Sequence, residues 1–289
     1  MPNEIITSRD NKWLKSFRAA LQGSGPKQSD PIGIEGRRLV ESALASGSAA
    51  QALLVSESGE RDLAHILEAA SGGRATLPHS HIFRTTDKLF ARVSGTEAPQ
   101  GIAALINQPA WDLEDALRGP ASSDGVYEAA ISGRPPLLVV MAAIQDPGNV
   151  GTIIRSAEAF GATGAIATQG TADPWSPKAL RASAGSALRL PLLRGRAVAV
   201  VLAQLRVSGA KIVAATAKAP ASLDTRLLRE CVSGPAAIFI GSEGTGLPAE
   251  VEHAADARIA IPMSDQVESL NAGVAASIAL YEMARLRRT

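Results

Sequence analysis

An uninterrupted apolar run near the middle of the chain restricts the possible folds more than any other feature. Residues 137–143 read Leu-Leu-Val-Val-Met-Ala-Ala. Runs of this kind are typical of strands in parallel sheets, because both faces of such a strand are covered by helices. Further short apolar segments follow, with helix-forming segments between them. The alternation predicts an α/β fold whose mostly parallel sheet carries helices on both faces.

The second half of the chain supplies the expected elements of this sheet. Besides the run at 137–143, strands are expected at 164–168, 190–193, 211–216, 236–240 and 257–261. Helices are expected at about 149–160, 177–186, 197–207 and 270–286. Ligands of such sheets bind beyond the carboxyl ends of the strands. The loops that follow the strands are therefore the expected place of a functional site.

The first hundred residues show the same alternation on a smaller scale. Strands are expected at 31–35, 51–56, 81–84 and 101–106, and helices at 8–23, 36–44, 61–70 and 86–93. Ser8 is the expected N-cap of the first helix. A polar, turn-rich segment then indicates a linker with one short helix. The sequence thus predicts a smaller α/β domain at 1–106, a linker at 107–136 and the larger domain at 137–289.

Composition excludes several classes of function. The net charge of +1 provides no global basic field, so a nucleic acid would have to bind local basic patches. A single cysteine excludes a disulfide framework, and the spacing of the four histidines predicts no metal site. No stretch approaches the ~20 apolar residues of a membrane span, and no secretory signal is visible. The cytoplasm is the expected compartment, without membrane partners.

Three strand ends in the larger domain carry unusual glycine-containing loops, at 145–155, 238–248 and 261–280. Each loop also holds functional side chains, namely Asn149 and Arg155, Ser242 and Glu243, and Ser269 and Asn271. No Gly-Lys-Ser/Thr sequence follows any of them, and the glycine spacing is not that of a dinucleotide fingerprint. A nucleotide-binding enzyme of the Rossmann class is therefore disfavoured.

The third loop runs into a helix with many small residues between 272 and 279. Small residues let backbones approach closely, and a helix N-terminus presents unpaired N–H groups. The stretch is therefore either a ligand-binding shelf or an ordinary strand–turn–helix with Ser269 as a simple N-cap. The sequence of this stretch alone leaves both interpretations open.

Taken together, the order and spacing of the three loops resemble the signature motifs of the SpoU/TrmH family of RNA 2′-O-ribose methyltransferases. The resemblance extends to residues 173–185, Asp-Pro-Trp-Ser-Pro-Lys-Ala-Leu-Arg-Ala-Ser-Ala-Gly. In the first domain, Asn11-Lys, Glu35-Gly36 and Thr-Glu-Ala-Pro-Gln-Gly at 96–101 look like the family's substrate-binding domain, which has a ribosomal-protein-like fold. The resemblance covers nearly the whole chain.

The resemblance implies a fold and a cofactor that periodicity does not reveal. The second and third loops and the last helix of the family form a deep trefoil knot, a rare exception to unknotted topology. S-adenosylmethionine binds against the knot, and the domain forms homodimers through helices of that region. By motif position, the resemblance implies cofactor contacts at Thr216, Gly241, Ile261, Met263 and Leu270.

Methyl transfer to a ribose 2′-hydroxyl requires groups that position the hydroxyl and relieve it of its proton. The resemblance implies catalytic roles for Arg155, Asn149, Glu243, Asn271 and Ser269. A guanidinium is a poor base because it loses its proton only at strongly alkaline pH, so Arg155 is expected to bind the adjacent phosphate and orient the hydroxyl. Proton acceptance by Arg155 stays open, as does a purely structural ion pair with Glu158.

The other motif side chains also have two interpretations each. Asn149 is expected to orient Arg155 or to cap its helix. Glu243 is expected to orient Arg155 or to fix the glycine loop. Ser269 and Asn271 are expected to contact RNA or to cap the last helix.

The expected partner is RNA, bound by local basic patches with the usual loss of affinity in salt. The candidate residues are Arg9, Lys12, Lys15, Arg18, Arg37, Arg38, Lys178 and Arg181. The resemblance favours ribosomal RNA over transfer RNA, because relatives with this first domain mostly modify large-subunit rRNA. The alternatives are a tRNA 2′-O-methyltransferase and a non-catalytic RNA-binding or ribosome-assembly factor. The intact Asn149, Arg155, Glu243 and Asn271 argue against a non-catalytic factor.

Overall fold

The chain folds as two compact units, each of which is described by itself. The computed structural model describes residues 4–23, 25–27, 30–72, 81–120, 134–217, 225–264 and 266–287. Unit 1 consists of residues 1–110 and 175–189, and unit 2 of residues 111–174 and 190–289. Residues 121–133 of the predicted linker lie outside the described residues. The short helix expected in the linker is α5 (Leu113–Arg118), which belongs to unit 2.

Unit 1 is built on a five-stranded mixed sheet. Its strand order is β1-β4-β3-β5-β2. β1 and β3 pair parallel with β4, whereas β5 runs antiparallel to both β2 and β3. The strands are β1 (Glu4–Ile6), β2 (Ile32–Glu35), β3 (Ala50–Ser56), β4 (Ile82–Thr85) and β5 (Ile102–Ile106).

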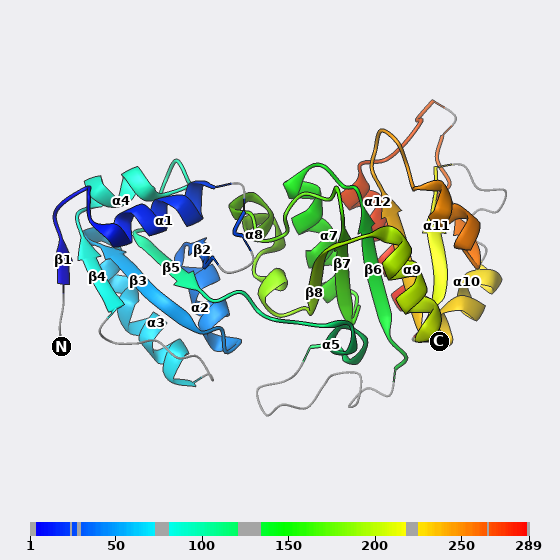
Figure 1. Cartoon of the computed structure of the whole chain (residues 1–289), viewed down its shortest axis with the longest axis horizontal. Coiled ribbons are helices and arrows are strands. Elements are labelled where there is room, and N and C mark those ends of the chain that lie inside the picture. Colours follow the sequence, from blue (N-terminus) through cyan, green and yellow to red (C-terminus); the bar gives the residue numbers. More distant parts are fainter. Residues whose placement is uncertain are drawn as a thin grey trace. The chain divides into compact units, whose positions relative to one another are not determined.

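Helices cover both faces of this sheet (Figure 1). α1 and α4 lie over one face, and α2 and α3 lie over the other. One core is formed by Leu14 and Phe17 of α1, Phe90 of α4 and apolar residues of the strands, all nearly inaccessible to solvent. The elements are α1 (Lys12–Gln22), α2 (Arg37–Ala45), the 3-10 turn η1 (Glu57–Gly59), α3 (Glu60–Gly72) and α4 (Asp87–Val93).

The first helix begins later than the sequence predicted. Asn11, rather than Ser8, is its N-cap, because the Asn11 side chain accepts a hydrogen bond from the backbone N–H of Trp13 at 2.8 Å. The Ser8 hydroxyl instead accepts from the backbone N–H of Asp10 at 3.2 Å. Both residue types cap well. The expectation for Ser8 was therefore wrong because two good caps stand three residues apart.

One helix of the predicted larger domain groups with unit 1. α8 (Pro177–Ser183) and the following 3-10 turn η3 (Ser186–Leu188) belong to unit 1, where α8 packs against α1 and β2. Arg189, just after the turn, donates to the hydroxyl of Ser42 on α2. Most residues of the motif at 173–185 therefore belong to unit 1.

Unit 2 contains the predicted parallel sheet. The strand order is β11-β9-β10-β6-β7-β8, and every neighbouring pair among these strands is parallel. All six residues of β6 are buried, as expected for a strand that is covered on both faces. The strands are β6 (Leu137–Ala142), β7 (Gly164–Thr168), β8 (Leu192–Arg196), β9 (Lys211–Ala215), β10 (Ala236–Gly241) and β11 (Ala257–Ile259).

Two sets of helices cover the two faces of the parallel sheet. α5, α9 and α11 contribute to one core with alternate strand residues such as Val140 and Phe239. α7, α10 and α12 pack with one another and on the opposite face. The elements are α7 (Pro147–Ala159), α9 (Val198–Val207), α10 (Thr225–Val232), α11 (Ala249–Ala254) and α12 (Ala272–Leu286). The predicted α/β fold is confirmed. None of the described helices is long and apolar enough to cross a membrane.

Candidate active site

The three glycine-containing loops meet at the carboxyl edge of the parallel sheet. Asn149 follows β6, Glu243 follows β10 and Asn271 follows β11. The amide nitrogen of Asn271 donates to Oδ1 of Asn149 at 2.9 Å and to Oε1 of Glu243 at 3.4 Å. The amide nitrogen of Asn149 donates to the same Glu243 oxygen. Residues that are far apart in sequence thus form one hydrogen-bonded cluster, hereafter the Asn–Glu–Asn cluster.

The cluster also holds the N-terminus of α12. Oε1 of Glu243 accepts the backbone N–H of Ala272 at 3.2 Å, and Oδ1 of Asn271 accepts those of Gly273 and Val274 at 3.0 and 3.2 Å. A carboxylate next to a helix N-terminus is favoured by the helix dipole. Asn271 is therefore the N-cap of α12, one of the two roles left open for it, and the alternative in which Ser269 is the cap was wrong.

α12 lies alongside α7 with the two helices running parallel. The hydroxyls of Ser156 and Ser277 are 2.7 Å apart, and the rings of Phe160 and Tyr281 meet edge to face at 5.6 Å. A Cβ atom on Gly273 would lie 3.1 Å from Cγ2 of Thr152. The contacts advance by four residues on both helices, which is one helical turn. The small size of Gly273 and Ser277 is thus explained by close packing against α7.

Arg155 projects from α7 and stays exposed. Within the described residues, its side chain forms neither a hydrogen bond nor an ion pair, so the alternative of a structural ion pair with Glu158 is not found. Neither Asn149 nor Glu243 forms a hydrogen bond or ion pair with it among the described residues, and the side chains of both bond within the Asn–Glu–Asn cluster. Asn149 does not cap α7 either, since Asp146 does so by accepting from the backbone N–H of Gly148 at 3.1 Å.

Gly241 ends β10 where the second loop folds back on itself. A Cβ atom on Gly241 would lie 2.4 Å from the backbone of Gly246, which is too close for any side chain. The backbone N–H of Gly246 donates to the carbonyl of Ser242 at 3.0 Å, and the hydroxyls of Ser242 and Thr245 are 2.8 Å apart. The fold of the second loop itself therefore requires a glycine at position 241.

The remaining residues predicted to bind a cofactor follow β9 and β11. The backbone N–H of Thr216 donates to the carbonyl of Ile259 at 2.9 Å, and its buried hydroxyl oxygen has no hydrogen-bond partner in the described part of the chain. Ile261, Met263 and Leu270 are half-exposed between β11 and α12. Within the same described part, their backbone groups form no hydrogen bonds. Among the described residues, no group of His, Cys, Asp and Glu could hold a metal ion.

All eight basic residues predicted to bind RNA lie in unit 1. Arg9, Lys12, Lys15 and Arg18 lie on or just before α1, Arg37 and Arg38 begin α2, and Lys178 and Arg181 lie on α8. Lys15 and Arg9 are within 4.0 Å of Asp10, and all three side chains are exposed to solvent. Arg37 differs from the others because it is held by two carboxylates, at 2.7 Å from Glu41 and 3.1 Å from Asp62.

The sequence analysis missed the neighbours that share a pocket with Arg37 and Arg38. Glu41, Arg61, Asp62 and Gln100 line the same hollow. The sequence does indicate that Glu41 is a neighbour of Arg37, because a spacing of four residues places both on one side of a helix. Arg61, Asp62 and Gln100 come from other elements, which spacing along the chain does not reveal.

Two family models match the chain. That of the SpoU rRNA Methylase family matches residues 136–281, and that of the MRM3-like substrate binding domain matches residues 26–104. An uncharacterized tRNA/rRNA methyltransferase of Synechocystis sp. is 33% identical over 97% of this chain and 93% of its own length. The 23S rRNA (guanosine(2553)-2′-O)-methyltransferase RlmP of Bacillus subtilis is 28% identical over 96% of this chain and 98% of its own.

Solved structures show the same architecture. The crystal structure of an AdoMet-bound rRNA methyltransferase from Sinorhizobium meliloti superposes with a TM-score of 0.76 at 26% identity. The superposition covers 98% of this chain and 97% of that one.

Proposed function

The chain belongs to the SpoU rRNA methylase family, and on this premise we propose that it transfers a methyl group from S-adenosylmethionine to a ribose 2′-hydroxyl in RNA. The protein is an RNA 2′-O-ribose methyltransferase, and ribosomal RNA is its proposed substrate. One observation carries the assignment to this chain: the Asn–Glu–Asn cluster joins all three signature loops at the carboxyl edge of the parallel sheet, one to two helical turns from the exposed Arg155.

The residues at this edge fit S-adenosylmethionine. The buried Thr216 hydroxyl lacks a hydrogen-bond partner among the described residues, and a buried hydroxyl without a hydrogen bond is costly. The backbone groups of Ile261, Met263 and Leu270 form no hydrogen bonds with the described residues and are available to polar groups of a ligand. Gly241 keeps the second loop turned back at the same edge. We assign the cofactor to these five residues.

When bound, S-adenosylmethionine supplies a sulfonium methyl group, and its sulfur leaves as a neutral thioether without the help of an acid. The chain's own residues must therefore position the ribose hydroxyl and let its proton depart to a base or to water. Aligning two bound reactants can lower the barrier by about 7–11 kcal/mol. Positioning is thus the main task of the site.

Arg155 is the residue that we assign to this task. Its exposed guanidinium presents a planar fork of donors that suits a phosphate group in two-pronged geometry. Bound to the phosphate next to the target ribose, Arg155 would hold the 2′-hydroxyl in position for methyl transfer. Asn149, Glu243 and Asn271 are positioning residues, because their hydrogen bonds fix the ends of α7 and α12. Ser269 is exposed and is assigned to RNA contact.

The function is tested with the purified full-length chain and S-adenosylmethionine carrying a labelled methyl group. We expect label in ribosomal RNA from cells that lack the protein, and mapping of 2′-O-methyl groups should return one nucleotide. If only transfer RNA is labelled, the substrate is transfer RNA and not ribosomal RNA. If calorimetry finds no cofactor binding and no RNA is labelled, a non-catalytic RNA-binding factor replaces the enzyme.

The same premise extends to domains and assembly. We assign substrate RNA to the domain at 1–106 and methyl transfer to the domain at 137–289, joined by the linker at 107–136. The two family matches at 26–104 and 136–281 support this division. The trefoil knot and the cytoplasm, where ribosomal RNA is found, remain part of the proposal.

A homodimer through the larger domain is proposed as well. Val274, Ile278 and Tyr281 of α12 are 46%, 37% and 55% exposed, and their spacing places them along one side of the helix. An exposed apolar stripe of this kind is suited to an interface between two copies.

A further inference from the structure

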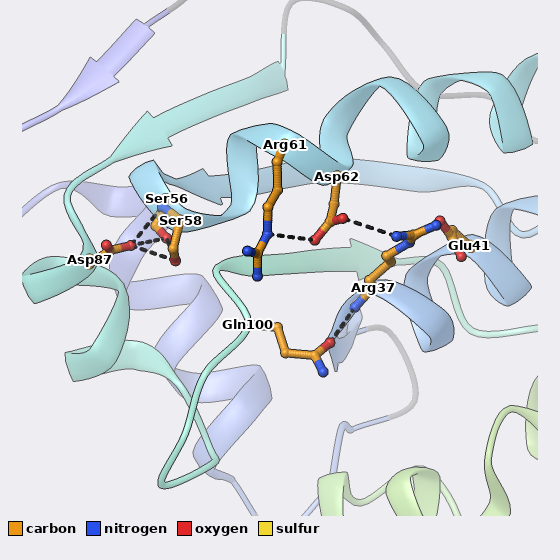
Figure 2. Close-up of polar contacts among 8 residues, drawn as sticks. All are labelled: Arg37, Glu41, Ser56, Ser58, Arg61, Asp62, Asp87 and Gln100. Carbon is orange, nitrogen blue, oxygen red and sulfur yellow. Dashed lines mark hydrogen bonds and ion pairs between the residues drawn. The ribbon is translucent and has the colours of Figure 1, made fainter.

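Unit 1 contains an open pocket next to the start of α2. Its volume is about 530 Å³, and it is lined by Arg37, Arg38, Glu41, Arg61, Asp62 and Gln100. Ligand pockets commonly measure about 300–1,000 Å³. Figure 2 shows Arg37 and Glu41 on α2, Arg61 and Asp62 on α3, and Gln100 on the loop that precedes β5.

The wall that contains Gln100 is held in place by hydrogen bonds to Glu35. The Glu35 carboxylate accepts from the Ser94 hydroxyl at 2.6 Å, and from the Gly95 N–H and the Thr96 hydroxyl at 2.9 Å. These bonds fix the beginning of the loop that carries Gln100. Oε1 of Gln100 then accepts the backbone N–H of Arg37 at 3.0 Å, which holds the Gln100 side chain against the start of α2 (Figure 2).

The wall that α3 contributes is anchored by hydrogen bonds at the start of that helix. Asp87 accepts hydrogen bonds from the hydroxyl of Ser56 and from both the N–H and the hydroxyl of Ser58, the last two at 3.1 and 2.8 Å (Figure 2). These bonds anchor η1, which leads directly into α3, the helix that bears Arg61 and Asp62. Both walls are therefore fixed by polar contacts within unit 1.

The Arg37 guanidinium is held between two carboxylates. Its Nε donates to Glu41 at 2.7 Å and its Nη1 to Asp62 at 3.1 Å. The hydrogen bond to Glu41 is the main cause that raises the pKa of Arg37. A guanidinium locked in this way presents a flat face, and unstacked RNA bases stack on such faces.

Charge decides which part of a nucleotide the pocket accepts. Two carboxylates beside Arg37 repel a phosphate. The second oxygen of Glu41 can accept an N–H group of a base, and so can that of Asp62, which lies 3.8 Å from Nε of Arg61, beyond hydrogen-bond distance. Guanine is the base that presents adjacent N–H donors on one edge. Arg38 is exposed at the rim, where it can bind a flanking phosphate, and Arg61 is exposed there as well but is paired with Asp62 at 3.8 Å. The pocket is therefore suited to a base with phosphates outside it.

We propose that this pocket binds an unpaired guanine nucleotide of the RNA, with the base stacked on Arg37 and its edge facing Glu41 and Asp62. The inference rests on the proposed function, because it takes RNA to be the substrate. It adds a second recognition site, in unit 1, to the methyl-transfer site in unit 2.

The test measures binding of the full-length chain to four labelled RNA hairpins by fluorescence anisotropy. The hairpins share one stem and differ only in a single bulged nucleotide: G, A, C or U. We expect the bulged-G hairpin to bind about tenfold more tightly than the others, since one good two-pronged base contact discriminates by roughly that factor. Equal affinity for all four would overturn the proposal. This comparison uses the unaltered chain, so it does not depend on any variant folding.

Variants then assign the preference to the pocket. Glu41→Gln replaces one carboxylate oxygen with an N–H donor and should abolish the preference for G. Arg38→Ala should weaken binding of all four hairpins alike. Lys88→Ala is the matched control, because it removes one exposed positive charge from α4, over the other face of the sheet (Figure 1). If Lys88→Ala reduces the preference as much as Glu41→Gln, the pocket is not the source.

The two proposals can fail separately. If the chain methylates RNA but shows no preference among the hairpins, the pocket proposal is wrong and the function stands. If the preference is present but no RNA accepts a methyl group, the pocket proposal stands and the function fails.

Discussion

At the scale of single residues, the motif side chains divide into those that build the site and those left for a ligand. Asn149, Glu243 and Asn271 direct their hydrogen bonds at one another and at the start of α12. In the described part of the chain, Arg155 has no partner, and neither does the hydroxyl of Thr216. The sequence predicted all five as site residues. It could not divide them, because spacing along the chain does not say which side chains bond across loops.

Arg155→Ala should lower methyl transfer by about 100-fold, the usual cost of losing one well-placed charged donor in an active site. Cofactor affinity should stay within about twofold, because Arg155 is assigned to the RNA phosphate. Arg155→Lys keeps the charge but loses the planar fork, so its rate should fall between the two. Single-turnover kinetics and calorimetry measure the two quantities. Near-normal turnover of Arg155→Ala would refute the assignment.

Gly241→Ala should disrupt the second loop, since the added Cβ would lie 2.4 Å from the backbone of Gly246. Overpacking of this kind costs about 1–3 kcal/mol of unfolding free energy, and cofactor affinity should fall with it. Gly244→Ala is the matched control three residues on, because a Cβ there meets nothing within 4 Å. Urea unfolding and calorimetry of both variants make the measurement. Equal behaviour of the two variants would contradict the steric explanation.

At the scale of elements, strands of the parallel sheet were predicted well because continuous apolar runs mark them. β7 has the predicted bounds, Gly164–Thr168, and β6 differs by one residue. β1, α10 and α11 were not predicted. β1 has three residues and α11 has six, which is too short for a clear periodic signal. α10 is strongly amphipathic, but the apolar residues at 227, 228, 231 and 232 follow a turn-rich stretch that obscured it.

Element packing also gives a pH dependence. The pKa of Asp87, the first residue of α4, is lowered chiefly by the hydrogen bond from Ser56 and further by those from Ser58. Its ionised form is thus favoured in the folded chain. The resulting stability is fully present above the ordinary aspartate value of 3.8 and is lost as the pH falls through the lower, folded-state value.

Asp87→Asn should therefore lower the free energy of unfolding near pH 6 and flatten its decline below about pH 3.8. Urea unfolding of both proteins across this range measures the difference. Asp10→Asn is the control, because Asp10 is an exposed carboxylate with only long ion pairs, and it should follow the wild-type curve. A wild-type-like decline in Asp87→Asn would show that Asp87 does not couple η1 to α4.

At the scale of the whole molecule, the eight basic residues assigned to RNA binding and the residues assigned to methyl transfer lie in separate units. Family membership, expected from the order of the three loops, is confirmed by the matches. Chain order did not predict that α8 groups with unit 1, because a helix between two strands of a parallel sheet normally packs on that sheet. Lys178 and Arg181 thereby join the other basic residues.

The proposed dimer gives the last prediction. The wild-type chain should sediment at about twice its monomer mass, with the stripe of Val274, Ile278 and Tyr281 buried between two copies. Val274→Glu combined with Ile278→Glu would place unpaired charges in that interface, which is strongly unfavourable. The double variant should therefore sediment as a monomer at micromolar concentration while keeping its circular dichroism spectrum.

Val207→Glu is the control for added surface charge, because Val207 on α9 is 91% exposed and lies on the opposite face of the sheet. It should stay dimeric. If the wild-type chain sediments as a monomer, the proposed interface is wrong. If Val207→Glu dissociates to the same extent as the double variant, the dissociation is caused by added charge and not by the loss of the α12 stripe. Because α12 starts at the Asn–Glu–Asn cluster, a dimer built on its stripe would also tie the two methyl-transfer sites to one interface, so the monomeric variant should lose methyl transfer together with dimerisation.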